Sequence, residues 1–284
     1  MTTFFHWLVV RFTKSNTNWL HTLLERAATL PRGRSEGRSE AIPEALWIAT
    51  LQRYPFLARR SVAGQRRLRE LTGEFLKHKE FSGAHGLVVT DDMAIDIAAQ
   101  ACLPVLHLGL KFYDDFKGIV LHPGAMLARR EVTDDTGVVH RYSEVLTGEA
   151  MERGPVTLSW QDVAAAGESA QEGYNVVIHE FVHKIDMRDG DADGRPPLPS
   201  RAARAAWDNV FQPAYESFRE KVAVAERFGG EPAWLDAYGA TSPAEFFAVT
   251  CEGYFVNRER FTEDFATLTL LFDQYFKLDQ PLAQ

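Results

Sequence analysis

The stretch Asn175-Val-Val-Ile-His-Glu-Phe-Val-His-Lys-Ile-Asp-Met187 contains the pattern His179-Glu180-x-x-His183 within an apolar run. On an α-helix, side chains four residues apart lie on one face with Cβ atoms about 5–6 Å from each other, so both imidazoles can reach one metal ion. Glu180 lies about 100° round the helix from His179, too far to join the ligand pair but able to approach a metal-held water. The stretch therefore predicts a zinc-binding helix in which Glu180 is the general base.

The residues around this pattern favour a buried helix. The apolar positions are Val176, Val177, Ile178, Phe181, Val182 and Ile185. Two histidines and a carboxylate in such a helix are costly unless they are paired or bound to a metal ion. The alternative is an ordinary core helix with two hydrogen-bonded histidines, because a pattern of five residues also arises by chance.

The composition indicates a globular protein. The 284 residues, 45% hydrophobic and 12% aromatic, are sufficient for a sizeable core in one large domain or two small ones. The formal net charge of −8 argues against a direct nucleic-acid partner, which requires a concentrated basic face. Two distant cysteines, Cys102 and Cys251, do not form a disulfide framework, so we expect a reducing compartment, the cytoplasm.

The N-terminus does not have the features of a targeting segment. Its apolar run at residues 4–10 is too short to span a bilayer and has no positive region before it, so we expect neither a membrane anchor nor a signal peptide. Residues 4–28 are compatible with a helix that docks on the body or on a partner. Gly-Arg-Ser-Glu occurs twice within residues 31–40, as in a flexible linker. The predicted organisation is an N-terminal helix with its linker, 1–40, and one main domain, 41–284.

Helices are predicted early in the main domain. Apolar residues at helical spacing favour helices over 44–57 and 62–81, and Thr90 or Asp91 can cap a third that runs to Ala101. The second helix carries a basic face, which we interpret as solvated surface rather than a dedicated anion site. Its members are Arg66, Arg67, Arg69, Lys77 and Lys79.

Short strands are predicted at residues 119–122, 137–142 and 155–160. In the last of these, Thr157 and Ser159 alternate with apolar residues, so one side can remain polar. It is either an exposed edge strand that holds an extended peptide through main-chain hydrogen bonds, or an interior strand. The fold class expected from these elements is α+β, rich in helix, with a small strand region beside the zinc helix.

Three further histidines are left out of the predicted site. Each stands alone without a partner at ligand spacing, and a single histidine is more often a core or surface residue than a ligand. They are His107, His122 and His140.

A third zinc ligand is required, because catalytic zinc sites generally have three protein ligands and a water. Asp189, six residues after His183, is one candidate. It is disfavoured because Asp186 stands where the turn of such sites requires glycine.

The other candidates lie on a later helix. Ser242 as N-cap and Pro243 at the first position predict where this helix begins. Glu245 and Glu252 are seven residues apart on the same face, so either can ligate, and Glu252 can instead orient a ligand. Glu245 also fits a capping box, in which it would only close backbone donors. Spacing alone leaves the choice open.

Several segments together carry a resemblance to a known family. The chain resembles the Mlc titration factor A (MtfA) peptidases over about residues 44–280, and the segment from Tyr238 to Phe247 is also similar to the catalytic domain of anthrax lethal factor, a related zinc protease. The matching segments are His179–Asp186 with Asp189-Gly190, Asp236-Ala-Tyr238, Ser242–Ala248, Cys102–Leu110 and Gly154–Trp160.

The resemblance implies a zincin-like metallopeptidase domain with one Zn²⁺ held by His179, His183 and Glu245. It also implies that Glu180 is the general base and that Tyr238 donates to the oxyanion of a tetrahedral intermediate. The family is understood as cytoplasmic, with aminopeptidase-type activity and the Mlc repressor as a partner. The expected partners are therefore a peptide substrate and an Mlc-like repressor, without direct contact to nucleic acid or membrane.

Two residue patterns close to the zinc helix have competing interpretations. Asp186 either accepts a hydrogen bond from a ligating imidazole or is a solvated aspartate at the helix end. Residues 189–194 imitate the start of a calcium loop, but the twelfth position is Ser200 and prolines crowd the helix that should follow, so we expect a solvated loop.

Two functions of different classes remain from the sequence. The first is zinc-dependent peptide hydrolysis. The alternative is a non-catalytic binding module that sequesters a transcriptional regulator and whose zinc is structural.

Overall fold

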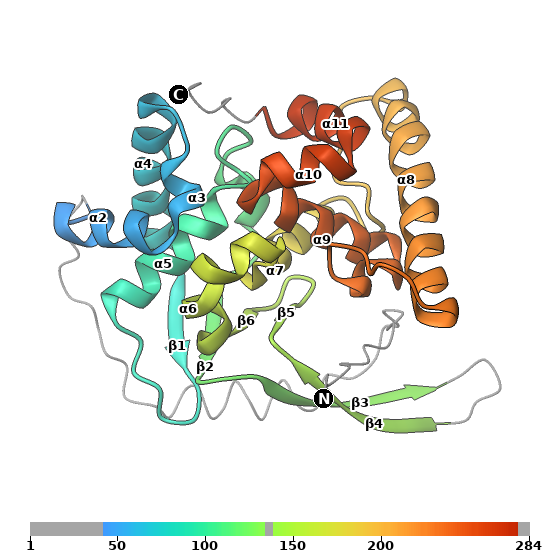
Figure 1. Ribbon diagram of the computed structural model, residues 1–284. Coiled ribbons are helices and arrows are strands. Elements are labelled where there is room, and N and C mark those ends of the chain that lie inside the picture. Colours follow the sequence, from blue (N-terminus) through green and yellow to red (C-terminus); the bar gives the residue numbers. More distant parts are fainter. Residues whose placement is uncertain (1–41, 134–138, 278–284) are drawn as a thin grey trace.

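The computed structural model describes residues 42–133 and 139–277, in which helices surround a small mixed sheet (Figure 1). The helices are α2 (Glu44–Arg53), α3 (Pro55–Ala58), α4 (Val62–His78), α5 (Asp91–Cys102), α6 (Trp160–Ser169), α7 (Val176–Asp186), α8 (Arg201–Phe228), α9 (Pro243–Val256), α10 (Arg258–Asp264) and α11 (Ala266–Phe276), with the 3-10 turns η1 (Leu110–Tyr113), η2 (Ala170–Glu172) and η3 (Ala237–Ala240). The strands are β1 (Glu80–Gly83), β2 (Gly118–His122), β3 (Met126–Thr133), β4 (Val139–Leu146), β5 (Gly148–Ala150) and β6 (Val156–Ser159). The expected helix-rich α+β class is confirmed.

The central sheet has four strands in the order β1-β2-β6-β5. Strands β1, β2 and β6 are parallel, and β5 runs antiparallel to β6 at the edge. Leu158 of β6 is paired with Leu121 on one side and with Gly148 on the other. The exposed-edge interpretation of residues 155–160 is therefore wrong, and the interior alternative is correct. Of the two edge strands, β1 and β5, the one in contact with α7 is β5, which has only three residues and so gives no alternating pattern in the sequence.

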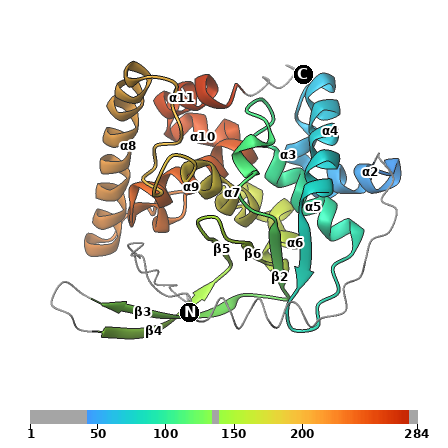
Figure 2. The ribbon, with the colours of Figure 1, turned by 180° about the vertical axis from the view of Figure 1, so that it is seen from behind.

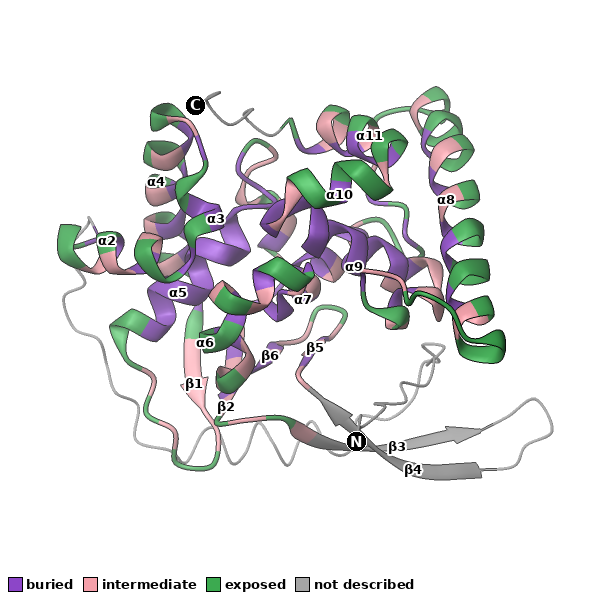
Figure 3. Cartoon of the chain, viewed as in Figure 1, coloured by how far each residue is buried: buried purple, intermediate pink, exposed green. Residues whose placement is uncertain are grey.

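Helix α7 lies at the centre of the molecule, where it contacts β5 and β6 on one side and α5, α6 and α9 on others. It is buried along most of its length, as are α5 and α9 (Figure 3). Helices enclosed on nearly all sides are apolar all round rather than on one stripe. That enclosure explains the continuous apolar run around the histidines.

Aromatic side chains from the C-terminal helices hold α9 in place. Trp207 of α8 stacks on Phe272 of α11 at 5.8 Å between ring centroids and meets Phe247 of α9 edge-on at 5.6 Å. Phe246 of α9 packs against Phe211 of α8 at 5.3 Å. Such pairs stabilise a core beyond their buried area, so α9 is a firm support for the side chains it directs towards α7. Figure 2 shows α8 flanking this group on the outside.

One of the predicted helices is interrupted and another ends earlier than expected. The helix predicted over 44–57 is divided at Tyr54 into α2 and α3, because Pro55 disfavours the helical conformation of the preceding residue. The helix predicted over 62–81 ends at His78, and Glu80 begins the strand β1. The third begins as expected, with the Thr90 side chain accepting from the Met93 amide.

The antiparallel hairpin of β3 and β4 leaves the body beside the sheet (Figure 1). The strand predicted over 137–142 falls partly in β4, from Val139, and its first residues lie outside the described part. The predicted N-terminal helix and linker, residues 1–40, are also outside it. Across 42–133 and 139–277, no helix has both the length and the apolar character needed to cross a bilayer.

Candidate metal centre

The first part of the site is α7, whose start is fixed by Asn175. The Asn175 side chain accepts a hydrogen bond from the Ile178 amide at 2.8 Å, which is the N-cap that satisfies a free helix donor. From this start, His179 and His183 come from successive turns on the same face. Their ring centroids are 4.8 Å apart and their Nε2 atoms 3.2 Å apart.

The second part is the first turn of α9. Ser242 accepts from the Glu245 amide at 3.2 Å, and Pro243 occupies the first helical position. The Glu245 carboxylate does not serve as a simple cap. Its Oε2 lies 3.1 Å from His179 Nε2 and 3.2 Å from His183 Nε2.

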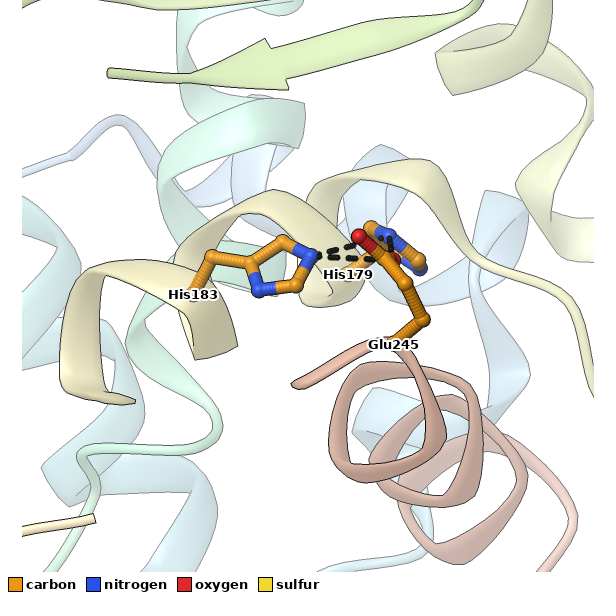
Figure 4. Close-up of side chains that lie close together, drawn as sticks. All are labelled: His179, His183 and Glu245. Carbon is orange, nitrogen blue, oxygen red and sulfur yellow. Dashed lines mark hydrogen bonds and ion pairs between the residues drawn. The ribbon is translucent and has the colours of Figure 1, made fainter. Parts of the chain in front are cut away.

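These three atoms form a compact set between the two helices (Figure 4). Zinc is bound by histidine nitrogen and carboxylate oxygen at about 2.0–2.2 Å, and tetrahedral ligands at that radius lie about 3.3 Å from one another. The observed separations of 3.1–3.2 Å agree with this arrangement. His179, His183 and Glu245 therefore fit a metal ion of this kind. In the described part of the chain they are the only group of three or more such residues gathered in this way.

Glu252 orients one of the imidazoles rather than joining the set. Its Oε1 lies 2.7 Å from His179 Nδ1, and its Oε2 accepts from the Asn175 amide at 2.5 Å. A carboxylate on the far nitrogen of a ligating histidine fixes the ring orientation and the tautomer. Of the roles left open for Glu252, the structure supports orientation. Asp189 is exposed and lies outside the group formed by His179, His183 and Glu245, so the geometry favours Glu245 as the third ligand.

The buried histidines and carboxylates of the site shift one another's pKa values. Burial alone would lower the pKa of both histidines, but the carboxylates of Glu252 and Glu245 raise the pKa of His179 well above its usual value, and Glu245 raises that of His183. Burial would raise the pKa of Glu245, and the two imidazoles outweigh it and hold that pKa well below its usual range. The carboxylate is thus kept ionised beside two imidazoles.

This balance predicts a pH dependence of metal binding. Metal ligation needs neutral imidazoles, while raised histidine pKa values mean that protons still occupy the metal-free site above the ordinary value of about 6.5. We expect the affinity for Zn²⁺ to fall as pH is lowered from 8 to 6, by about tenfold per pH unit for each displaced proton. A competition titration with a chromophoric chelator at several pH values measures this slope. An affinity for Zn²⁺ that does not change between pH 8 and 6 would contradict the raised pKa values of the two histidines.

Glu180 is 6% exposed and faces the edge strand. Burial, together with the nearby carboxylates of Glu245 and Glu149, raises its pKa to about 7, against the opposing effect of the two imidazoles. A Cβ added to Gly148 of β5 would lie 2.5 Å from Glu180 Oε1. Glycine at this position therefore lets the strand approach the carboxylate closely.

Tyr238 is in η3, and its ring lies beside His179. Its ring is half-buried and stacks on that of His179, with centroids 6.2 Å apart and planes 27° apart. The ring is therefore next to the metal set, and its role as a donor remains a prediction.

Asp186 differs from both expectations. It is fully buried, so it is not a solvated helix end, and its Oδ2 accepts from the Gly194 amide at 2.8 Å. Its Oδ1 has no hydrogen-bond partner among the described residues, which excludes the expected bond from a ligating imidazole there. Burial raises the pKa of Asp186 to about 7. Its contact is with the loop that follows α7.

Residues that connect β5 to α7 also belong to this region and were missed by the sequence interpretation. Thr147 and Tyr174 share a hydrogen bond of 3.0 Å, and Lys184 donates to the main chain after β5. One signal was available: Lys184 is a charged residue inside a continuous apolar run, and such a residue is rarely buried without partners.

Comparison with known proteins identifies the group to which the chain belongs. The model of the family described as glucose-regulated metallo-peptidase M90 matches residues 29–277. The chain belongs to this family. As an M90 protein it is a metallopeptidase, which agrees with the resemblance noted from its motifs. The match starts at residue 29 and so extends into the segment that the resemblance left out.

Curated M90-like relatives cover most of the chain. A protein named Mlc titration factor A from Serratia proteamaculans is 39% identical over 231 residues, 81% of this chain and 86% of that protein. Proteins of the same name are 35% identical in Klebsiella pneumoniae (strain 342), over 79% of this chain and 83% of theirs, and 34% identical in Yersinia pestis, over 84% and 86%. The family match over residues 29–277 includes both α7 and α9.

Proposed function

We propose that the chain is a zinc-dependent peptidase of the aminopeptidase type that works in the cytoplasm. The observation that carries this proposal is the meeting of two imidazoles and one carboxylate, at 3.1–3.2 Å, next to the buried Glu180. Catalytic zinc sites commonly combine three such protein ligands with an open position for water. The aminopeptidase preference is supported by the resemblance to MtfA peptidases. The two cysteines, free and buried, are compatible with a reducing compartment.

When bound, Zn²⁺ supplies a water with a pKa of about 7 and polarises the scissile carbonyl. Glu180 accepts the proton of that water and passes it to the leaving amine. In the metal-free site burial raises the pKa of Glu180 to about 7, so this carboxylate binds a proton more readily than an exposed glutamate does, as a group that accepts and returns a proton must. Tyr238, stacked on His179, donates to the oxygen that becomes negative.

The edge strand β5 supports an extended substrate. Within the described residues, β5 pairs only with β6, and its other edge has no partner strand. An extended peptide adds to such an edge through main-chain hydrogen bonds. Gly148 is on this strand and next to Glu180, so a peptide along β5 passes close to the reacting groups.

Chelation provides the first test of the activity. We expect the purified protein to contain about one zinc ion per chain and to hydrolyse chromogenic amino-acid anilides. Dialysis against a chelator is expected to abolish hydrolysis, and stoichiometric Zn²⁺ to restore it, because all proposed steps need the occupied site. Zinc content by atomic emission and initial rates are measured on the same samples. Protein that hydrolyses these substrates at an unchanged rate after losing its metal would contradict the proposal.

A second function is favoured by the name that the relatives share. Mlc titration factor A refers to Mlc, and we propose that this chain also binds a repressor of the Mlc type. In the alternative to catalysis, that binding would be the sole function and the zinc would be structural. The wild type and a folded Glu180→Gln variant are compared for repressor binding and for hydrolysis. Repressor binding by a wild type that hydrolyses nothing favours the binding module. A hydrolytic rate in the wild type that is lost in the variant favours the enzyme.

A further inference from the structure

The edge strand β5 is attached to the metal-binding helix at both of its ends. The first attachment comes from Tyr174, which immediately precedes the N-cap of α7, and the second from Lys184, one residue after the second histidine. Between them, Gly148 lies against Glu180. Strand and helix are therefore joined at three places along a short distance.

The first attachment is a hydrogen bond between two hydroxyl groups. Thr147 Oγ1 and Tyr174 Oη are 3.0 Å apart, and burial is the main cause that raises the pKa of Tyr174 far above its usual value. The Thr147 carbonyl also accepts from the Ser159 amide at 2.7 Å, within the sheet. Thr147 thus connects the start of β5 to both β6 and the residue in front of α7.

The second attachment is a buried ammonium group. Lys184 is 1% exposed, and its Nζ donates to the carbonyls of Met151 and Gly154, the latter at 2.9 Å. Its Nζ also lies 4.5 Å from the centre of the Phe116 ring. A charged donor on two carbonyls is stronger than a neutral hydrogen bond, so the turn between β5 and β6 is held firmly to α7.

The contact between Gly148 and Glu180 determines how closely β5 approaches α7. A Cβ at Gly148 would be 2.5 Å from Oε1 and 2.6 Å from Cγ of Glu180, so no side chain separates strand from carboxylate. Within a gap this small, a shift of either end by 1 Å changes the position of a bound peptide relative to Glu180. Misplacement of that size strongly reduces catalytic efficiency.

We propose that Tyr174 and Lys184 are positioning residues. They hold β5 at a fixed distance from α7 and in a fixed position along it, and thereby determine how an extended substrate binds. This inference rests on the proposed peptidase function and adds to it the parts that place the substrate. Neither side chain is among the metal-facing atoms. Their loss is therefore expected to weaken substrate binding while the metal set of His179, His183 and Glu245 stays intact.

The first test removes single hydroxyl groups. Tyr174→Phe, Thr147→Val and the double variant are compared by zinc content, KM and kcat. Each single change is expected to raise KM about 3- to 10-fold, in line with one lost hydrogen bond, with zinc content unchanged and kcat affected less. The double variant is expected to resemble the singles, since the bond can be lost only once. Additive effects would show that the two hydroxyls do not act through each other.

The second test uses a matched pair of buried lysines. Lys79 resembles Lys184 chemically: it is 8% exposed, donates to the carbonyls of Tyr113 and Phe116, and its pKa is also lowered to about 8, chiefly by burial. Its partner carbonyls, unlike those of Lys184, lie outside β5 and the turn that follows it. Lys184→Met is expected to raise KM about tenfold or more, whereas Lys79→Met loses comparable stability and keeps KM near the wild-type value.

Hydrogen exchange separates failure of this inference from failure of the peptidase function. Amides of residues 147–154 are expected to exchange at least about tenfold faster in Tyr174→Phe and Lys184→Met, and not in Lys79→Met, regardless of any activity. If the wild type has no peptidase activity but both variants exchange faster in this segment, the attachment of β5 to α7 is correct and the proposed peptidase function is wrong. An active enzyme in which both variants keep wild-type KM and wild-type exchange in this segment would overturn the inference.

Discussion

Glu180→Gln is expected to keep the metal and to lose activity. The amide has the same shape as the carboxylate and fits the same buried position, but it cannot accept the proton of the attacking water. A positioned general base contributes about 10²- to 10⁴-fold, so kcat is expected to fall by that range while the zinc content stays near one ion per chain. Stopped assays with high enzyme concentration and metal analysis on one preparation give both values.

His183→Ala is the companion variant for this experiment. It removes a nitrogen of the metal set and is expected to lose both metal and activity, which Glu180→Gln does not. The comparison distinguishes failure of the base from failure of the site. A fully active Glu180→Gln protein would remove the proposed mechanism, because the amide cannot accept the proton of the attacking water.

Glu245→Ala is expected to strip the zinc. Its Oε2 contacts both imidazoles, so its removal leaves two ligands of the three and unbalances the raised histidine pKa values. Loss of a residue that only orients a ligand lowers metal affinity about 10- to 100-fold, and loss of the ligand itself is expected to exceed about 100-fold. Competition titration with a chelator measures the difference directly.

Two control variants accompany this second experiment. Asp189→Ala changes an exposed side chain and is expected to bind Zn²⁺ like the wild type. Glu252→Gln removes the charge beside His179 Nδ1 and is expected to fall between the other two, because it affects ligand orientation only. Equal zinc retention in Glu245→Ala and Asp189→Ala would reject Glu245 as the third ligand.

Local patterns predicted much of the site. The apolar run around His179 and His183 predicted a buried helix, and α7 has that character along Val176–Asp186. Ser242 and Pro243 predicted where α9 begins, and it begins there. These predictions succeed because helix periodicity and capping depend on residues only a few positions apart.

Other features were missed because they depend on distant partners. The edge position belongs to β5 rather than β6, since pairing on both sides of β6 involves β2 and β5 from separate parts of the chain. Asp186 was expected to be either solvated or bonded to an imidazole, and instead it is buried and accepts from the Gly194 amide of the loop after α7. Burial of this kind depends on which segment folds over the helix end.

The sequence by itself determined that the chain has a helix with two imidazoles on one face and a neighbouring carboxylate, because α-helical geometry fixes which side chains share a face. It left Glu245 and Glu252 undecided, since both lie on one face of a second helix. Only the tertiary structure, in which α9 crosses beside α7, turns Glu245 towards both Nε2 atoms and Glu252 towards His179 Nδ1. That choice is made by the packing of aromatic side chains behind α9, and no spacing along the chain contains it.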